Sequence, residues 1–401
     1  MANSLTAFNP AYWTPTMQET FLKESVALGV ANTELRADLK DGDTLHKPYG
    51  SYPRVQTYTK GTDITVKDIS STDDTLSVST AKVASFYVDD IDRIQNKYAT
   101  IQEFARIAQR QLNNTLDQAV LAEYSNAGTT LDDGSIGGTA GNGIVFSVSN
   151  APTVMTAMGR TLNSKKRLSP DRFCLIGPRM LETIIQYVAG RETGFGDTVG
   201  DNGKVGRRFG FDLMLSNNLP NTATLTLSTN PSEGDTVTIN GVVFEFRETE
   251  GDITAGRVWV DRHASTASTT VDNFVDCINN AATEGTDYAI MSAENRQLLE
   301  EAGIVATDAT TSVTFVWYGD IVVSEGLTAA ANVWSAQYQY ALAGVNKSID
   351  LVTQVSPNVV FRDAQLRLGK YVHPWMLYGK KTFERMKNNL VATKFDVSAW
   401  V

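Results

Sequence analysis

Histidine and cysteine are scarce in this chain, with three and two among 401 residues. The histidines are His46, His263 and His373, and none lies at a zinc-site spacing from another histidine, cysteine or carboxylate. Cys174 and Cys277 are far apart in apolar surroundings, so we expect buried free thiols and not a disulfide or a nucleophile. No Gly-x-Ser-x-Gly or other local catalytic motif is present either. These absences argue against a zinc enzyme and against a disulfide-stabilised secreted domain.

Long apolar runs are also missing. No stretch approaches the roughly 18 apolar residues that a membrane span needs. The N-terminal residues lack the basic start and apolar run of a signal peptide. We therefore expect no membrane association and synthesis in a reducing cytoplasm. Hydrophobic residues at 42% and charged residues at 20% are typical of a globular protein.

Charge is distributed unevenly along the chain. The formal net charge is −10. Residues 222–338 hold 17 acidic residues against four basic ones, a net of −13, whereas the remainder holds 31 basic and 28 acidic residues, a net of +3. Such asymmetry, in a chain longer than one core usually supports, predicts two or three structural units in different surroundings.

The strongest secondary-structure signal is a strand that runs into a long amphipathic helix within residues 83–125. Apolar side chains recur there every three or four residues, at Ile101, Phe104, Ala105, Ala108, Leu112, Leu116, Ala119 and Val120. The opposite face is polar. This spacing predicts one buried helix face on a helix long enough to cross a small domain.

Two segments upstream of this helix lack a core of their own. The first 50 residues read as an arm with a short helix from Pro15 to about Gly29. Residues 51–82 are poor in large apolar groups but alternate locally, which predicts a long two-stranded hairpin with strand segments at 55–58, 64–66 and 76–78. Because an isolated hairpin is only marginally stable, we expect it to lie on another subunit.

The rest of the chain alternates between helical and strand patterns. The elements expected before the acidic stretch are helices at 152–163 and 180–188 and strands at 172–176 and 209–215. Residues 222–338 predict a small α+β unit, with a hairpin about Asn240-Gly241, helices at 271–281 and 293–302, and strands at 312–318 and 320–323. Strands at 349–360 and 362–378 follow.

This order resembles the major capsid proteins of tailed bacteriophages, the Hong Kong 97-like fold. The hairpin, the strand and spine helix, and the glycine-led strand that ends in Ser216-Asn217-Asn218-Leu219-Pro220 carry the resemblance. It implies an α+β fold with an inserted domain. The implied parts are an N-terminal arm (1–50), an extended hairpin loop (51–85), a peripheral domain with the spine helix (86–150), the first part of an axial domain (151–221), the inserted surface domain (222–338), the axial return (339–361), and the peripheral C-terminal strand and tail (362–401).

The resemblance implies a coat protein that assembles into the icosahedral head shell of a tailed phage. Its partners would be itself in hexamers and pentamers, scaffolding and portal proteins, and packaged double-stranded DNA through weak contacts that are independent of sequence. It implies a virion component with no cofactor and no catalytic role. Two alternatives stay open: a phage tail or decoration protein, which the Gly-Asp-Thr-Val-Thr-Ile-Asn-Gly-Val phrase suggests, and a hydrolase whose site is assembled in space.

Two sets of charged residues are candidate contact sites. Lys60, Lys67, Asp73 and Asp74 lie in or beside the hairpin, and we expect them to form salt bridges to a neighbouring subunit. The second set is a basic cluster that could face DNA, with a solvated face or an intersubunit salt bridge as the simpler interpretation. Its members are Lys165, Lys166, Arg167 and Arg172.

Two further motifs favour structural interpretations over binding sites. The loop 193–206 is rich in glycine, but Val205 follows Lys204 where a phosphate-binding loop needs serine or threonine. Asp89, Asp90 and Asp92 could hold a hard cation. Their position at a helix start favours interaction with the helix dipole instead.

Overall fold

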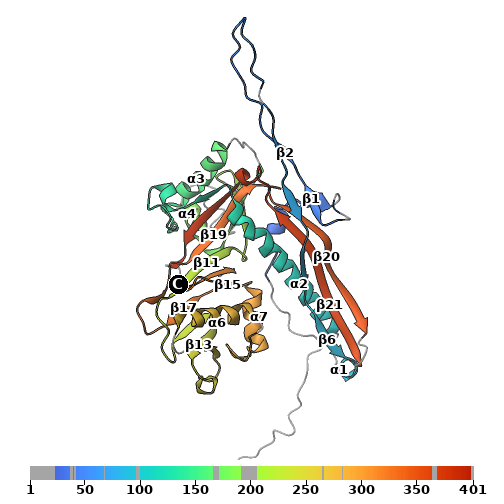
Figure 1. Ribbon diagram of the computed structural model, residues 1–401, viewed down its shortest axis with the longest axis vertical. Helices are drawn as coiled ribbons and strands as arrows, with labels where there is room; N and C mark the ends of the chain where they lie inside the picture. Colours follow the sequence, from blue (N-terminus) through green and yellow to red (C-terminus); the bar gives the residue numbers. More distant parts are fainter. Residues whose placement is uncertain are drawn as a thin grey trace, which may run out of the picture.

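The computed structural model describes residues 23–36, 39, 42–66, 68–95, 100–165, 171–190, 206–263, 266–281, 283–363 and 368–398. Figure 1 shows a long, narrow limb beside a broader body, with a thin excursion of the chain, out and back, projecting beyond both. The limb contains the spine helix α2 (Thr100–Leu121) and a four-stranded sheet. The body is built on a ten-stranded sheet, with a second four-stranded sheet at its far end.

The limb is organised around two long antiparallel strands, β20 (Asp350–Asp363) and β21 (Gly369–Lys381). The short strands β5 (Thr80–Val83) and β6 (Phe86–Asp89) pair in turn with the other edge of β21. The helix α1 (Asp90–Gln95) follows β6 directly. β20 ends at Asp363 and β21 begins at Gly369, so Arg362 lies in β20 and does not begin the following strand as expected.

The spine helix α2 forms where the sequence predicts a long amphipathic helix, which confirms that prediction. Leu112 and Leu116 of α2 are buried with Leu351 and Met376 of the adjoining sheet. The first turns are less covered, since Phe104 is 44% exposed and its ring lies 6.1 Å from that of Phe86. The apolar stripe thus extends beyond the region that this chain alone buries.

The central sheet runs in the order β15 (Val305–Asp308), β16 (Ser312–Tyr318), β11 (Pro220–Leu227), β19 (Tyr338–Val345), β8 (Arg172–Ile176), β10 (Phe211–Leu215), β9 (Arg207–Arg208). Three further strands join this order: β22 (Leu390–Asp396) pairs with β19 and with β7 (Thr129–Leu131), and β18 (Asn332–Trp334) pairs with β11. β8 and β10 are parallel. Every residue of β8 is buried, which explains its unbroken apolar run Phe-Cys-Leu-Ile.

Helices α3 (Ala151–Ser164) and α4 (Pro178–Ala189) pack against this sheet. Their buried faces include Met158 of α3 and Ile184 of α4, which share a core with Phe211 and Phe395 from two strands of the sheet. Both helices lie within about two residues of the ranges that the sequence predicts. The hydrophobic period alone is sufficient here because each helix has one fully covered face.

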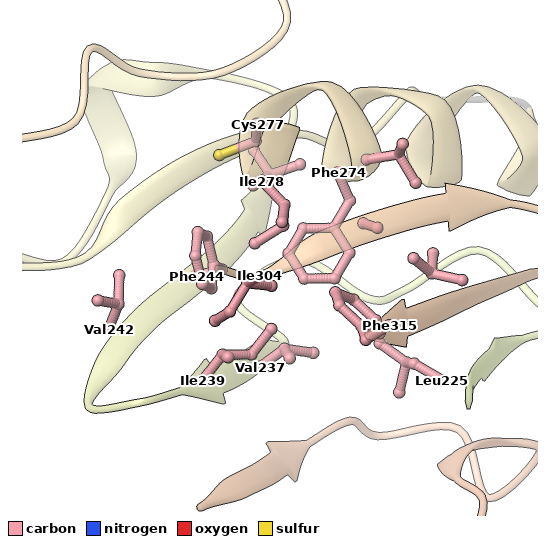
Figure 2. Packing of buried hydrophobic residues seen from close by; sticks show 14 of the residues in the cluster. Leu225, Val237, Ile239, Val242, Phe244, Phe274, Cys277, Ile278, Ile304 and Phe315 are labelled. Carbon is pink, nitrogen blue, oxygen red and sulfur yellow. The ribbon is translucent and has the colours of Figure 1, made fainter. Parts of the chain in front are cut away.

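The acidic region, residues 222–338, has its own hydrophobic core. Its four-stranded sheet runs β14 (Val258–Asp261), β13 (Val242–Arg247), β12 (Thr236–Ile239), β17 (Val323–Gly326), and its helices are α6 (Ala267–Asn279) and α7 (Ala293–Glu301). Figure 2 shows Phe274 pointing from α6 toward Phe315. The Phe274 ring centroid lies 5.3 Å from those of Phe244 and Phe246 and 5.8 Å from that of Phe315. Such edge-on aromatic contacts add to the burial energy.

The acidic region is nevertheless joined to the body by main-chain hydrogen bonds. β11 pairs along its length with β16 and, at Asn221 and Thr222, with β19. Strands β11, β15, β16 and β18 of this region therefore belong to the central sheet, whereas its four-stranded sheet is separate. The expected strand at 320–323 is instead β17, which begins at Val323. The hairpin forms as predicted, with Asn240 at φ 52° and Gly241 at φ 80°, the left-handed pair that a tight two-residue turn requires.

The excursion at residues 51–70, here called the finger, differs from the predicted hairpin. Residues 51–66 carry no assigned strand; among the described residues its two arms pair as strands at the base, through β2 (Tyr49–Gly50) with β3 (Ser71–Thr72), and Gln56 Nε2 donates to Thr65 O farther out. Below that, β1 (Thr44–His46) pairs with β4 (Thr75–Ser77). The predicted third strand segment at 76–78 belongs to the limb, where Leu76 and Val78 are buried.

The N-terminal arm is described only from Lys23. Most of the helix expected from Pro15 lies outside the described residues. Its last part is a short 3-10 turn, η2 (Ala27–Gly29), with Ala27 and Val30 buried against the spine helix. No described helix is both long enough and apolar enough to cross a membrane.

Candidate assembly surfaces

The finger exposes apolar side chains along its whole length. Tyr52, Val55, Ile64 and Val66 are 82%, 95%, 69% and 86% exposed. The tip is a tight turn in which Thr62 N donates to Thr59 O at 3.1 Å. An excursion without a core, carrying aligned apolar groups into solvent, is a typical interaction surface.

The expected contact residues of the hairpin have different environments. Lys60 is exposed at the tip. Lys67 lies outside the described residues. Asp73 Oδ2 is 2.5 Å from His46 Nδ1, and Asp74 Oδ1 is 2.6 Å from Lys381 Nζ.

Asp74 is therefore a contact within the chain. Its side chain is only 13% exposed, and its second oxygen accepts a hydrogen bond of 2.8 Å from Glu384 N. Burial raises the pKa of Asp74, but the hydrogen bonds from Glu384 and Lys381 outweigh it and lower the pKa below its usual value. The carboxylate is therefore paired within its own subunit and largely covered, and its expected intersubunit contact stays a prediction.

The basic cluster is only partly on a surface. Lys165 is exposed at the end of α3, whereas Lys166 and Arg167 lie outside the described residues. Arg172 is 8% exposed and donates to Asn163 Oδ1 at 2.6 Å. Burial lowers the pKa of Arg172. Arg172 is thus a structural residue of β8 and does not face outward as the sequence suggested.

The motifs that could have carried chemistry have structural roles where they are described. Asp89 Oδ1 accepts a hydrogen bond of 2.8 Å from Ile91 N, which caps the start of α1. No group of three or more histidine, cysteine, aspartate or glutamate side chains suited to a metal ion occurs among the described residues. Cys174 and Cys277 are fully buried, and burial raises the pKa of each thiol to about 12. The glycine-rich loop lies outside the described residues except for Gly206.

A buried polar cluster that the sequence did not reveal holds the arm to the spine helix. Asp117 of α2 accepts hydrogen bonds from Ala27 N at 2.7 Å, Leu28 N at 3.3 Å and Asn218 Nδ2 at 3.1 Å. Asn218 Nδ2 also donates to Asn114 Oδ1 at 2.6 Å. Burial raises the pKa of Asp117, while these hydrogen bonds act in the opposite direction. The phrase Ser-Asn-Asn-Leu-Pro thus includes a residue that locks three segments together.

An open groove separates the limb from the acidic region. Its volume is about 890 Å³, and its walls come from α2, from the connection of β5 to β6, and from the end of α7 with β15. Gln111, Thr115 and Gln118 of α2 face Gln297 and Glu300 of α7 across it. Apolar side chains such as Val83, Phe86 and Leu112 share the lining with these polar groups, so the groove has a mixed surface.

Comparison with known proteins agrees with this structure. The family model described as "Phage capsid protein" matches residues 51–275, more than half of the chain. A search of curated proteins finds no match.

Solved phage structures share the fold at low sequence identity. A chain of Mycobacterium phage Che8 is 14% identical, with a TM-score of 0.59 and coverage of 97% of this chain and 98% of that one. The capsid of cyanophage P-SCSP1u gives 13% identity, a TM-score of 0.57 and coverage of 98% and 94%. The head of Helicobacter pylori bacteriophage KHP40 gives 8%, 0.52, and 99% and 98%.

The family match covers the finger, the spine helix, the first strands of the body and the acidic region as far as α6. The chain therefore belongs to the phage capsid protein family.

Proposed function

We propose that the chain has the domain arrangement of the Hong Kong 97-like fold. The limb would be the peripheral domain, and the body would be the axial domain. Residues 222–338 would be an inserted domain on the outer surface. The copies would form hexamers and pentamers of an icosahedral head, assembled with scaffolding and portal proteins. Because such a protein works through contact area between subunits, we assign no catalytic residue.

The finger is the observation that carries this proposal. Burying one exposed valine or isoleucine is worth about 1.5–3 kcal/mol, and the finger presents several such groups beyond the core of its own subunit. A neighbouring copy would supply the missing burial. In a closed ring, every copy would make this contact with its neighbour. The finger, which is only marginally stable alone, would then be the principal link between subunits.

Electron microscopy of a shortened finger tests this role. Replacing residues 53–68 by Asn-Gly should leave β2 and β3 closed by a tight turn and the subunit folded. We expect folded subunits that fail to close shells. Normal shells from this variant would contradict the proposed role of the finger.

A matched pair of substitutions separates surface chemistry from length. Val55→Ser with Val66→Ser removes apolar groups from the finger, whereas Val322→Ser with Val333→Ser removes two valines of the acidic region that are 59% and 46% exposed. We expect the first pair to lower the yield of shells and the second to leave it unchanged. Equal yields of shells from the two variants would show that the finger contributes through its length and not through burial of its apolar side chains.

We further propose that packaged DNA meets the remainder of the chain and not the acidic region. The support is charge: the acidic region has a net of −13 and the rest of the chain a net of +3. DNA contact would be weak, independent of sequence and easily removed by salt. Lys165 is the exposed member of the expected basic cluster.

A further inference from the structure

The base of the finger lies where the two large sheets meet. β21 ends at Lys381 in the sheet of the limb, and β22 begins at Leu390 in the central sheet of the body. The connection between them, residues 382–389, therefore passes from one sheet to the other, as residues 346–349 between β19 and β20 also do. We call it the joint. Its contacts reach both the finger and the spine helix.

Arg385 of the joint contacts the finger directly. Its guanidinium lies 5.1 Å from the ring centroid of Tyr49 and 4.6 Å from that of Tyr52, and Nη2 donates to Gly50 O. Stacking on two rings restricts the direction in which the first arm of the finger leaves the subunit. Arg385 is itself exposed, so these contacts are not a by-product of core packing.

The return arm is held from the other side of the joint. Asp74 follows β3, and its carboxylate is bonded to Lys381 Nζ at 2.6 Å and to Glu384 N at 2.8 Å. Asp74 O accepts from Lys47 N at 2.8 Å, which ties the two arms together below the finger. Both arms are thus fixed to residues 381–385.

Phe383 anchors the joint beneath these polar contacts. Its ring is 4% exposed and packs with Leu76 and Val352. Lys47 Nζ lies 4.6 Å and Lys381 Nζ 5.8 Å from its centroid. The buried ring gives the joint a fixed position, and the polar contacts around it transmit that position to the finger.

The end of the spine helix holds the joint from within. Glu123 follows α2 and is 5% exposed. Its Oε2 accepts from Thr382 N at 3.0 Å, and its Oε1 lies 3.5 Å from Lys380 Nζ. Gly128, in the next turn of the chain, donates from N to Lys387 O at 2.7 Å. Neither Glu123 nor Gly128 belongs to the finger.

From these contacts we propose that the joint is a mechanical coupling that sets the direction of the finger from the relative position of the limb, the body and the end of the spine helix. A rotation between the two sheets would move residues 382–389, and the finger would turn with them. The finger is accordingly not a free loop: its direction is a property of the whole subunit. This inference concerns the isolated subunit, so it stands or falls separately from the proposed assembly.

Distances between paired spin labels test the coupling in the full chain. Asp63→Cys places one label near the finger tip, and Thr153→Cys on α3 or Arg362→Cys on β20 places the other on the body or the limb, all at exposed positions. Cys174 and Cys277 are fully buried and should not be labelled. Light scattering confirms that the sample is unassembled. We expect one narrow distance population from the finger to each sheet.

Three substitutions in this labelled background probe the contacts. Arg385→Ala removes the stacking, and Asp74→Ala removes the second anchor. Glu123→Gln weakens the joint without touching the finger. We expect all three to broaden the distances from the finger to both sheets, with Glu123→Gln as the decisive case because Glu123 bonds to Thr382 of the joint and lies outside the finger.

Glu103→Gln is the matched control, since Glu103 lies on α2, the helix that Glu123 follows, in a partly exposed ion pair with Arg106 at 2.5 Å. It should leave the distances unchanged. Circular dichroism identifies any variant that unfolds, and Arg385→Ala, at an exposed position, keeps the test valid if Asp74→Ala does so. Distances in folded Arg385→Ala and Glu123→Gln that match the unsubstituted chain would overturn the coupling.

Discussion

Single residues in this capsid protein matter most where they join segments distant in sequence. Asp117 is the main example, because one carboxylate satisfies two main-chain groups of the arm and one side-chain amide from the body. Removing a buried acceptor leaves its donors without partners, at a cost of about 1–3 kcal/mol for each uncompensated group. The hydrophobic pattern placed Asp117 on the polar face of the helix and gave no sign of this role.

We predict that Asp117→Ala lowers the free energy of unfolding by about 2–4 kcal/mol, measured by urea denaturation at neutral pH. Asp320→Ala is the control, since Asp320 is an exposed carboxylate 3.7 Å from Arg179. We expect the control to change stability by less than about 1 kcal/mol. Equal losses in the two variants would contradict the locking role.

The pH dependence of the same site has a defined sign. Burial raises the pKa of Asp117 in the folded state, so the folded chain takes up this proton more readily than the unfolded chain. The stability that this shift contributes is complete below the pKa of an unfolded aspartate and is lost as pH rises through the folded pKa. The stability difference between the unsubstituted chain and Asp117→Asn should therefore shift in favour of the variant with rising pH.

Among the helices and strands, the sequence predicted those elements that a hydrophobic period or a turn motif defines. The spine helix, α3, α4 and the Asn240-Gly241 hairpin are examples, because each depends on neighbours within a few residues. Pairing between distant strands was not predictable in this way. The sequence pattern includes β4 in the hairpin because Phe383, which packs with Leu76 of that strand, lies some three hundred positions away.

The hairpin of β12 and β13 in the acidic region depends on one buried ion cluster. The Glu245 side chain is fully buried, with Oε1 2.5 Å from Arg247 Nε and Oε2 3.2 Å from Arg257 Nη1. Burial raises its pKa, but the hydrogen bonds from Arg247 and Thr254 dominate and lower it. Glu245 therefore stabilises the fold above the pKa of an unfolded glutamate, and this contribution is lost as pH falls through the folded pKa.

We predict that Glu245→Gln costs about 3 kcal/mol of stability at pH 7, because two arginines lose their buried partner. The cost should shrink as pH falls below the unfolded pKa of glutamate. Thermal unfolding between pH 3 and pH 7 measures both effects. Glu294→Gln, at an exposed position of α7, is the control and should show neither. A pH-independent cost would indicate that Glu245 acts through packing and not through its charge.

At the scale of the whole molecule, charge and connectivity give complementary information. The charge count separated residues 222–338 from the remainder, and the core of that region is indeed drawn from residues within it. Its continuity with the central sheet through β11 could not be read from composition, since a shared sheet edge leaves no charge signature. The acidic region therefore moves with the body, although its surface chemistry differs.

This arrangement leads to a prediction about orientation in the shell. A wall of net −13 facing packaged DNA would repel phosphates at close range, so the acidic region should face outward. We expect an affinity tag inserted after Gly251, in the exposed turn before β14, to bind antibody on intact, DNA-filled particles. A tag placed before Met1 should bind only after the particles are opened, since the arm is expected on the lumenal side. Antibody binding at Met1 but not at Gly251 on intact particles would reverse this orientation.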